Sequence, residues 1–439
     1  MSKLRSQHMP IIWHDTSKND SDRPSSQSPL SEKAGLIGRV GLMLLAFGAG
    51  SFRVRAAMNK LSRALNVTCN ADIGLKSIDY TCIENGETCT NALSNVTTGV
   101  NTDKLHYMEI FCDGFGERTE RYSIDDFHKM LDTIEREKGN YSILQLSLAS
   151  AAACMAFSFL LGAGIYDMVT TFIAAFIGYM VRKLLLNRKI TLFANTGAGV
   201  LASCLSYILL GKLMVAIVGT PIDFRAGYIC SMLYVIPGFP LITGGIDLAK
   251  LDLKSGIERI TYAVLVIGVA SLSAAFAASV LHFAPVDFEP YTLPVYYLIP
   301  LRFVMSFVGV FGFSILFNST YKMASIAGLM GAVANVLRLC LIDLGIGMSI
   351  AAFCGALTAG LLASAIKNHI GFPRITLTVP SIVIMVPGMF MYKGMFFFSQ
   401  ADFATGLNWF AKAVIVVVSL PLGLVFARIM TDKNFRKRT

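Results

Sequence analysis

From Ile143 to its last residues, the chain is a succession of long apolar stretches separated by short polar loops. A helix that crosses a bilayer core needs about 20 apolar residues. This pattern predicts ten transmembrane helices and excludes a soluble globular fold for this part of the chain. We place the helices at 143–163, 165–181, 192–211, 228–248, 259–282, 294–316, 323–342, 346–366, 376–397 and 408–428.

The composition agrees with a membrane protein that also carries a soluble part. The chain is 54% hydrophobic and only 15% charged, whereas about a quarter of the residues are charged in a soluble domain. Many of its charged residues precede Ile143. We expect a polar, disordered tail over residues 1–34 and a small α+β domain over residues 35–142.

Local signals describe this small domain. The apolar run 40–50 lies between Arg39 and Arg53, so it is too short to span a bilayer and predicts a buried or surface-lying helix. β-prone stretches on either side of Asn85-Gly86 predict a hairpin. Ser123 followed by two aspartates predicts the start of a short helix that ends near Gly139.

The distribution of basic residues predicts the orientation of the chain. The loop after the second helix reads "RKLLLNRK", and the chain ends in "RIMTDKNFRKRT". Every loop rich in lysine or arginine falls on the same side of the membrane, whereas the opposite loops contain Asp167, Asp223 and the acidic stretch "FAPVDFEP". Because basic loops stay in the cytoplasm, both termini and the small domain are predicted to be cytoplasmic.

The membrane part contains an internal repeat. A shift of 150 residues without gaps superimposes Pro237 on Pro387, Cys204 on Cys354 and six pairs of glycines, where chance predicts about one pair. The repeats cover residues 143–290 and 291–439. Since each contains five helices, the second must have the opposite orientation, and such inverted repeats are typical of secondary transporters.

Helix breakers interrupt the fourth and ninth helices at equivalent positions. "IPGFPLITGG" contains Pro237, Gly238, Thr243 and Gly244, and "MVPGMFMYKG" contains Pro387 and Gly388. Proline and glycine free backbone groups that a membrane tolerates only against protein or a water-lined cavity. The matched pair predicts a transport site where the repeats meet, and a simple kink or close helix packing is the alternative.

Asp247 is the main candidate for proton coupling. It follows Pro237 and lies near the cytoplasmic end of the fourth helix. An ionisable group inside a membrane is often functional, so Asp247 is predicted to accept a proton or to bind an α-amino group. The alternative is a structural role, as an interfacial helix cap or in an ion pair with Lys250 or Arg259.

Five further residues are candidates for substrate binding. Arg338 could bind a carboxylate bidentately, and Lys393 could balance a carboxylate beside the second break. Asn195, Thr196 and Asn335 suit a zwitterionic ligand that bears a hydroxyl group. The alternatives are that the cations extend to the membrane surface and that the uncharged side chains join helices by hydrogen bonds.

The sequence contains no recognised motif for chemistry on a substrate. Phosphate-binding loops, nucleophile elbows and metal-ligand spacings are absent, which predicts a protein without cofactor, metal or enzymatic activity. The formal net charge of +10 is explained by basic cytoplasmic loops, so no nucleic-acid partner is expected.

Two stretches, "GAGSFRVRAAMNKLSRALNV" and "IPGFPLITGGIDLAKLDLKSGIERI", together with the five-plus-five layout, resemble the bacterial threonine/serine exporter family. The resemblance covers nearly everything after residue 35. It implies export of threonine and serine through the bacterial plasma membrane, driven by the proton gradient or the membrane potential. Related two-component members of the family are linked to succinate export.

Other functions remain alternatives at this stage. A succinate exporter would need two converging cations, and Lys393 with Arg338 would supply them. A membrane receptor or an intramembrane enzyme would belong to another class. The spans contain no paired aspartates or Ser/His couple for an enzyme, and an inverted repeat suits alternating access better than signalling. A homo-oligomer is left open.

Overall fold

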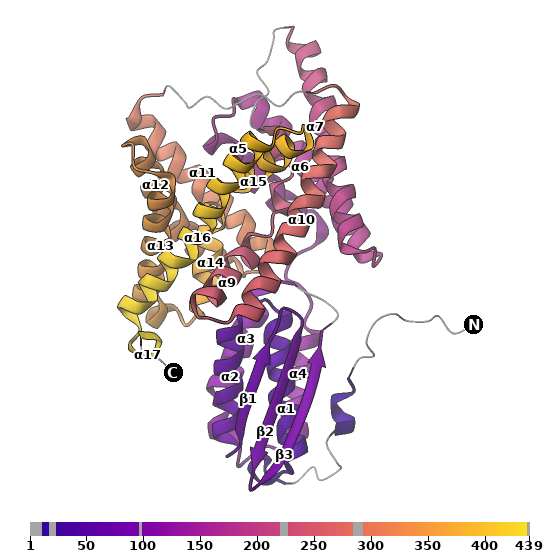
Figure 1. The fold of residues 1–439 in the computed structure, drawn as a ribbon, viewed down its shortest axis with the longest axis vertical. Coiled ribbons are helices and arrows are strands. Elements are labelled where there is room, and N and C mark those ends of the chain that lie inside the picture. Colours follow the sequence, from indigo (N-terminus) through magenta and orange to yellow (C-terminus); the bar gives the residue numbers. More distant parts are fainter. Residues whose placement is uncertain (1–10, 17–22, 96–98, 220–226, 284–292, 437–439) are drawn as a thin grey trace, which may run out of the picture. The chain divides into compact units, whose positions relative to one another are not determined.

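The computed structural model describes residues 11–16, 23–95, 99–219, 227–283 and 293–436 (Figure 1). The fold divides into a first unit, Met1–Gly139 with Ile246–Arg259, and a second unit, Asn140–Gly245 with Ile260–Thr439. The sequence had assigned residues 246–259 to the first membrane repeat, whereas they pack with the first unit. Most of the acidic loop at 283–290 and the loop containing Asp223 lie outside the described residues.

The first unit contains an antiparallel sheet of three strands in the order β1-β2-β3. Alternate residues of the central strand, Ile78, Tyr80 and Cys82, are buried, as expected for a sheet with one covered face. Asn85 and Gly86 form the predicted hairpin turn, both with positive φ. The strands are β1 (Thr68–Ile73), β2 (Ser77–Glu84) and β3 (Glu87–Ser94).

The helices of the first unit follow the local sequence signals. The apolar run near residue 40 lies in a largely buried helix that is not among the candidate spans found in the described residues, as predicted. Ser123 begins α4 with a capping box, in which its side chain and that of Asp126 bind each other's backbone amide. The helices are α1 (Leu30–Ala46), α2 (Ser51–Ala64), α3 (Thr102–Asp113), η3 (Gly116–Arg118) and α4 (Ile124–Arg136).

The described parts of the predicted disordered tail are ordered, so that prediction is wrong for them. They form η1 (Trp13–Thr16), η2 (Ser25–Gln27) and the start of α1. His14 is held by Asp125 at 2.7 Å and Asp132 at 3.2 Å, and these hydrogen bonds raise the pKa of its imidazole. Pairing with distant acidic side chains offsets the entropy cost that favours disorder in a polar segment.

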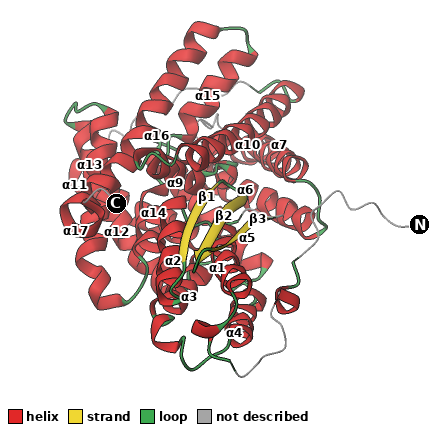
Figure 2. Ribbon diagram, turned by 60° about the horizontal axis from the view of Figure 1, so that its bottom comes forward, coloured by secondary structure: helices red, strands yellow, loops and turns green. Residues whose placement is uncertain are grey.

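The second unit consists almost entirely of helices, coloured magenta to yellow in Figure 1 and red in Figure 2. The described residues contain eight helices that are long and apolar enough to cross a membrane, or up to ten spans if each of two bent pairs counts as one. This confirms the predicted membrane helices. From residue 143 onward, the described helices, including the parts of the two bent pairs, are α5 (Ile143–Leu160), α6 (Ile165–Asn187), α7 (Leu192–Val218), α8 (Gly227–Cys230), η4 (Leu233–Val235), α9 (Gly238–Ala249), α10 (Leu253–Val280), α11 (Val295–Leu316), α12 (Tyr321–Asp343), α13 (Met348–Ile370), α14 (Arg374–Val383), α15 (Gly388–Ser399), α16 (Phe403–Thr431) and α17 (Lys433–Arg436).

A single ungapped shift does not relate all helices of the two halves. The shift found in the sequence, here called the break shift, superimposes Pro237 on Pro387 and aligns the starts of α9 and α10 with those of α15 and α16. A longer one, the helix shift, superimposes Gly162 on Asn318, which both have positive φ after the first helix of their half. The helix shift aligns the starts of α6 and α7 with those of α12 and α13. The first half therefore has extra residues between the start of its third helix and its break, partly because α7 has 27 residues and α13 has 23.

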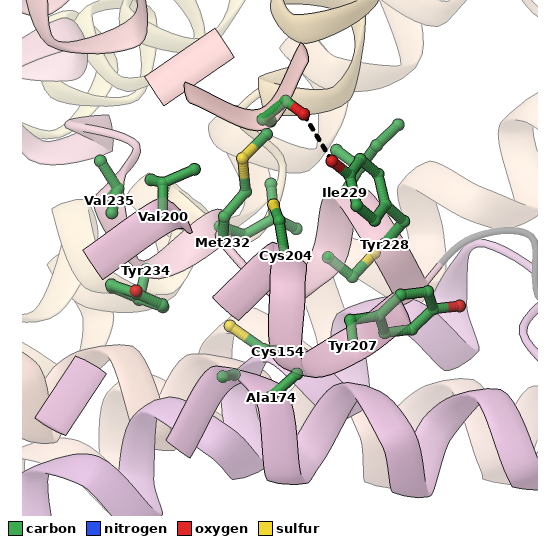
Figure 3. Close-up of a cluster of buried hydrophobic side chains, with 14 of the residues drawn as sticks. Cys154, Ala174, Val200, Cys204, Tyr207, Tyr228, Ile229, Met232, Tyr234 and Val235 are labelled. Carbon is green, nitrogen blue, oxygen red and sulfur yellow. Dashed lines mark hydrogen bonds between the residues drawn. The ribbon is translucent and has the colours of Figure 1, made fainter. Parts of the chain in front are cut away.

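A buried cluster lies in this unit, with most of its residues from the first half and a few, such as Tyr392, from the second (Figure 3). Tyr228, Ile229 and Tyr234, which precede the first break, lie in it together with Cys204 of α7. The hydroxyl of Tyr228 donates to the carbonyl oxygen of Ala274 at 2.5 Å. The segment before the break is therefore fixed by packing and by hydrogen bonding.

Candidate functional site

The two Pro-Gly sequences break their helices in the same way. The axis turns by 64° between the segments 227–235 and 238–249, and by 51° between α14 and the helix after Pro387. At each break the glycine amide donates to the carbonyl oxygen of the residue before the proline, at 2.8 Å for both Gly238 and Gly388. Since proline has no amide proton to continue the helical hydrogen bonds, the bend lies where the sequence predicts it.

The breaks pack against each other. A Cβ atom on Gly238 would lie 3.1 Å from Val383 and 3.4 Å from Val386, both just before the second break. A Cβ atom on Gly388 would meet Ile236 and, at 3.2 Å, Leu233, both just before the first. Each glycine thus allows the other half to approach, and the side chains at the contact are aliphatic. Close packing, the alternative considered from sequence, describes the immediate surroundings of both glycines.

These contacts are reciprocal, as in an isologous interface. The break shift superimposes Leu233 on Val383 and Ile236 on Val386, so exchanging the halves converts one contact into the other.

A second reciprocal contact lies where α5 and α11 meet. A Cβ on Gly312 would lie 2.9 Å from Ala153, and one on Gly309 would lie 3.8 Å from Ala156. These two pairs exchange under the helix shift. Small side chains of both halves thus form a second contact that is unchanged when the halves are exchanged.

The structure brings two of the predicted polar residues together. Arg338 donates through Nη1 to the side-chain oxygen of Asn335 at 2.9 Å, and Asn335 donates to Ser306 at 2.8 Å. The Nε atom of Arg338 is buried and has no hydrogen-bond partner among the described residues. This unsatisfied donor next to an amide is the feature that a carboxylate ligand would complete.

Two of the other uncharged candidates, Thr243 and Asn195, donate hydrogen bonds to backbone carbonyl oxygens. Thr243 donates to the carbonyl oxygen of Phe239, one turn earlier in α9, at 2.9 Å. Gly244 lies within the same helix. Asn195 donates to Ile190, while its side-chain oxygen and the hydroxyl of Thr196 are buried without a partner among the described residues.

Lys393 lies beside a tryptophan ring. Its ammonium group is 4.4 Å from the ring centroid of Trp409, and that of Lys412 is 4.6 Å from the same ring. Two cations of the second half therefore lie over one aromatic side chain.

Asp247 lies in the first unit, in a buried ion pair. Its carboxylate is 3.2 Å from Nε of Arg259 and accepts a hydrogen bond from Ser255 at 2.9 Å. It also accepts from the amide of Ser51, at the start of α2, and Arg259 donates to the carbonyl oxygen of Ala49 at 2.7 Å. This is the ion pair that the sequence offered as the alternative to a proton carrier, and it adds two partners from a distant part of the chain.

The same contact unites the two stretches that resemble the exporter family. Asp252 accepts a hydrogen bond from the Ser51 side chain at 2.9 Å and pairs with Arg55 at 2.7 Å. A Cβ on Gly50 would lie 2.9 Å from Asp247. The "GAGSFRVR" and "GGIDLAKLDLKSGIER" segments therefore form one polar cluster, with a glycine where the carboxylate approaches.

Asp167, which the sequence placed in a loop, is a buried carboxylate in the first turn of α6. Its side chain accepts from the hydroxyl of Tyr207 at 2.6 Å and from the amide of Gly227 at 3.1 Å. Gly227 begins the segment that leads to the first break. The acidic position is visible in the sequence, but its partners in α7 and α8, far along the chain, are not.

Comparisons with known proteins match almost the whole chain. Residues 35–281 match the family described as "Putative threonine/serine exporter", and residues 302–430 match "Threonine/Serine exporter, ThrE". No solved structure matches.

The similar proteins include bacterial transporters of two kinds. A "Probable threonine/serine exporter" of Mycobacterium tuberculosis is 23% identical over 411 residues, which are 90% of this chain and 75% of that protein. A "Probable succinate transporter subunit YjjP" of Klebsiella aerogenes is 28% identical over 227 residues, which are 50% of this chain and 82% of that protein. Its Escherichia coli namesake is 28% identical over 228 residues.

Proposed function

Because the chain belongs to the threonine/serine exporter family, a family of membrane transporters, we propose that it exports threonine and serine by alternating access between its two halves. The reciprocal packing of the two Pro-Gly breaks supports this proposal most strongly. Contacts that exchange with the halves fit a unit with two related arrangements, in which the breaks pack from one side or the other.

The proposal includes an inverted repeat. Each half contributes five spans when its bent pair counts as one, and an odd number requires the second half to have the opposite orientation in the bilayer. With the basic loops in the cytoplasm, both termini lie on the cytoplasmic side of a bacterial plasma membrane. Pro237, Gly238, Pro387 and Gly388 then lie near the middle of the bilayer.

We propose threonine and serine rather than succinate as the substrates, because the similarity to the exporter relative extends over most of this chain. The similarity to the succinate-transporter relatives extends over half of it. Succinate remains the second candidate because a dicarboxylate needs two cations, and the ammonium groups of Lys393 and Lys412 both lie over the ring of Trp409.

Proton coupling through Asp247 is the finer part of the proposal. Protonation would neutralise the carboxylate and release Arg259 and the amide of Ser51. Asp247 lies near the C-terminus of α9, the helix that begins at the first break, so one helix carries both the ion pair and the break. Replacing Asp247 by asparagine should remove the dependence of export on the pH gradient, and unchanged coupling would eliminate Asp247 as the carrier.

The direct test uses purified protein in proteoliposomes loaded with labelled threonine, serine or succinate. We expect threonine and serine to leave the vesicles, faster with a pH gradient or membrane potential than without. Efflux of succinate alone would replace the preferred substrates by the second candidate. If none of the three moves under any gradient, the export proposal fails.

A further inference from the structure

Arg182 and Arg338 occupy equivalent positions in the two halves. The helix shift, which relates α6 to α12 and α7 to α13, superimposes one arginine on the other. Each packs against a glycine of the next helix: a Cβ on Gly199 would lie 2.8 Å from Cβ of Arg182, and one on Gly355 would lie 3.3 Å from Cβ of Arg338. The same shift superimposes the two glycines. The correspondence thus includes the contact as well as the residue type.

Both arginines lie beside the residues that lead into the breaks. The Cβ position of Gly199 is 3.3 Å from the hydroxyl of Tyr234, which lies just before the first break. The Cβ position of Gly355 is 3.1 Å from the sulfur of Met385, which lies just before the second. In each half, the glycine that the arginine packs against therefore also contacts the segment whose direction changes at the break.

Hydroxyl groups lie beside the glycine that Arg182 packs against. Tyr234 and Ser203 share a hydrogen bond of 3.0 Å, and the rings of Tyr179 and Tyr234 meet edge to face at 5.5 Å. Tyr179 and Arg182 are at i and i+3 positions of α6, so their side chains share one face of that helix. Among the described residues, no carboxylate pairs with Arg182.

Arg338 lies beside an amide in the second half, where Arg182 lies beside a tyrosine in the first. Asn335 takes the place of Tyr179 under the helix shift, and it accepts a hydrogen bond from Nη1. The Nε donor remains buried and unsatisfied within the described part of the chain. An arginine inside a membrane is costly unless a negative group or other acceptors complete its hydrogen bonds, and a carboxylate fits the fork of a guanidinium best.

We propose that Arg182 and Arg338 are a pair of carboxylate-binding residues, one for each access state of the transporter. Under the inverted arrangement, Arg182 lies near the cytoplasmic end and receives the substrate, and Arg338 lies near the other end and releases it. The hydroxyls around Arg182 suit a small hydroxylated amino acid. This inference rests on the proposed function and assigns substrate contacts within it.

Charge-removing substitutions test the pair. Arg182→Gln and Arg338→Gln should each reduce threonine efflux by about tenfold to a hundredfold, because each removes a hydrogen bond to a charged group. Arg188→Gln and Lys322→Gln, which alter exposed cations at one end of each of these two helices, should leave efflux unchanged. The double variant Arg182→Gln/Arg338→Gln should also lose the increase in melting temperature that threonine produces in the detergent-solubilised wild type.

A comparison of ligands separates binding from folding. Threonine methyl ester lacks the carboxylate, so wild-type protein should prefer threonine to the ester and the double glutamine variant should lose that preference. Arg182→Lys and Arg338→Lys, which keep the charge, should fold like the wild type and keep part of the preference. Wild-type efflux and ligand preference in the glutamine variants would refute the role of these arginines while leaving export intact. Absence of efflux in the wild type itself would refute the proposed function instead.

Discussion

Replacing Asp247 by asparagine should loosen the start of α2. The Asp247 and Arg259 side chains are 1% and 4% exposed, so water screens their attraction little, and breaking such a buried pair costs about 3–5 kcal/mol. Asparagine keeps the shape and can still accept the hydrogen bonds of Ser51 and Ser255. We therefore expect the lower part of this range. If the free energy of local opening at the start of α2 falls by about 2 kcal/mol, the backbone amides of that segment exchange about 30-fold faster.

Hydrogen–deuterium exchange of the full-length protein measures this change on the peptide that covers residues 50–58. Asp113→Asn is the matched control, because the Lys60–Asp113 pair also involves α2 but its side chains are 47% and 69% exposed. Such a pair contributes about 0–1 kcal/mol, so exchange in the control should change by less than about fivefold. Equal exchange in both variants would refute the structural importance of the Asp247 ion pair.

Two further predictions concern packing and pH. Gly388→Leu should abolish export, because the added side chain would enter the other break. Gly268→Leu should not, because a Cβ at that position meets nothing within 4 Å. Efflux measures the export of each variant, and the elution profile of the purified protein shows whether it has folded. Burial and the charge of Arg39 lower the pKa of His128 to about 4, from about 6.5 in an unfolded chain. As the pH falls from 6.5 to 4, the unfolded chain binds a proton that the folded chain does not. The first unit should therefore lose up to about 3 kcal/mol of its free energy of unfolding over this range. His128→Gln should flatten this loss in urea unfolding followed by Trp13 fluorescence, and an unchanged slope would contradict the assignment.

Features that depend on neighbouring residues could be predicted from the sequence. The turn at Asn85 and Gly86, the capping box at Ser123 and the bends after Pro237 and Pro387 require only the residues beside them. The apolar stretches similarly identify the membrane helices, because length and hydrophobicity suffice.

Features that depend on distant partners could not. Nothing near Asp247 indicates that its carboxylate would accept a hydrogen bond from Ser51, in a remote part of the chain. Arg182 was missed for another reason. The break shift, applied without gaps to both halves, hid its equivalence to Arg338, since the extra residues of the first half lie between the start of its third helix and its break. Arg182 is also the first residue of the stretch "RKLLLNRK", which is predicted from the sequence to be a basic cytoplasmic loop.

The reciprocal contacts of the two breaks have a consequence for how such a protein can be encoded. The backbone of Gly238 packs against the side chain of Val383, and that of Gly388 packs against the side chain of Leu233. Because these contacts are non-covalent, the attraction between the halves does not require one continuous chain. The peptide connection between the halves contributes a high effective concentration. Two separately synthesised halves with the same surfaces could therefore assemble if these contacts bind tightly enough. When the halves are fused in one chain, a lower affinity between the same surfaces is sufficient.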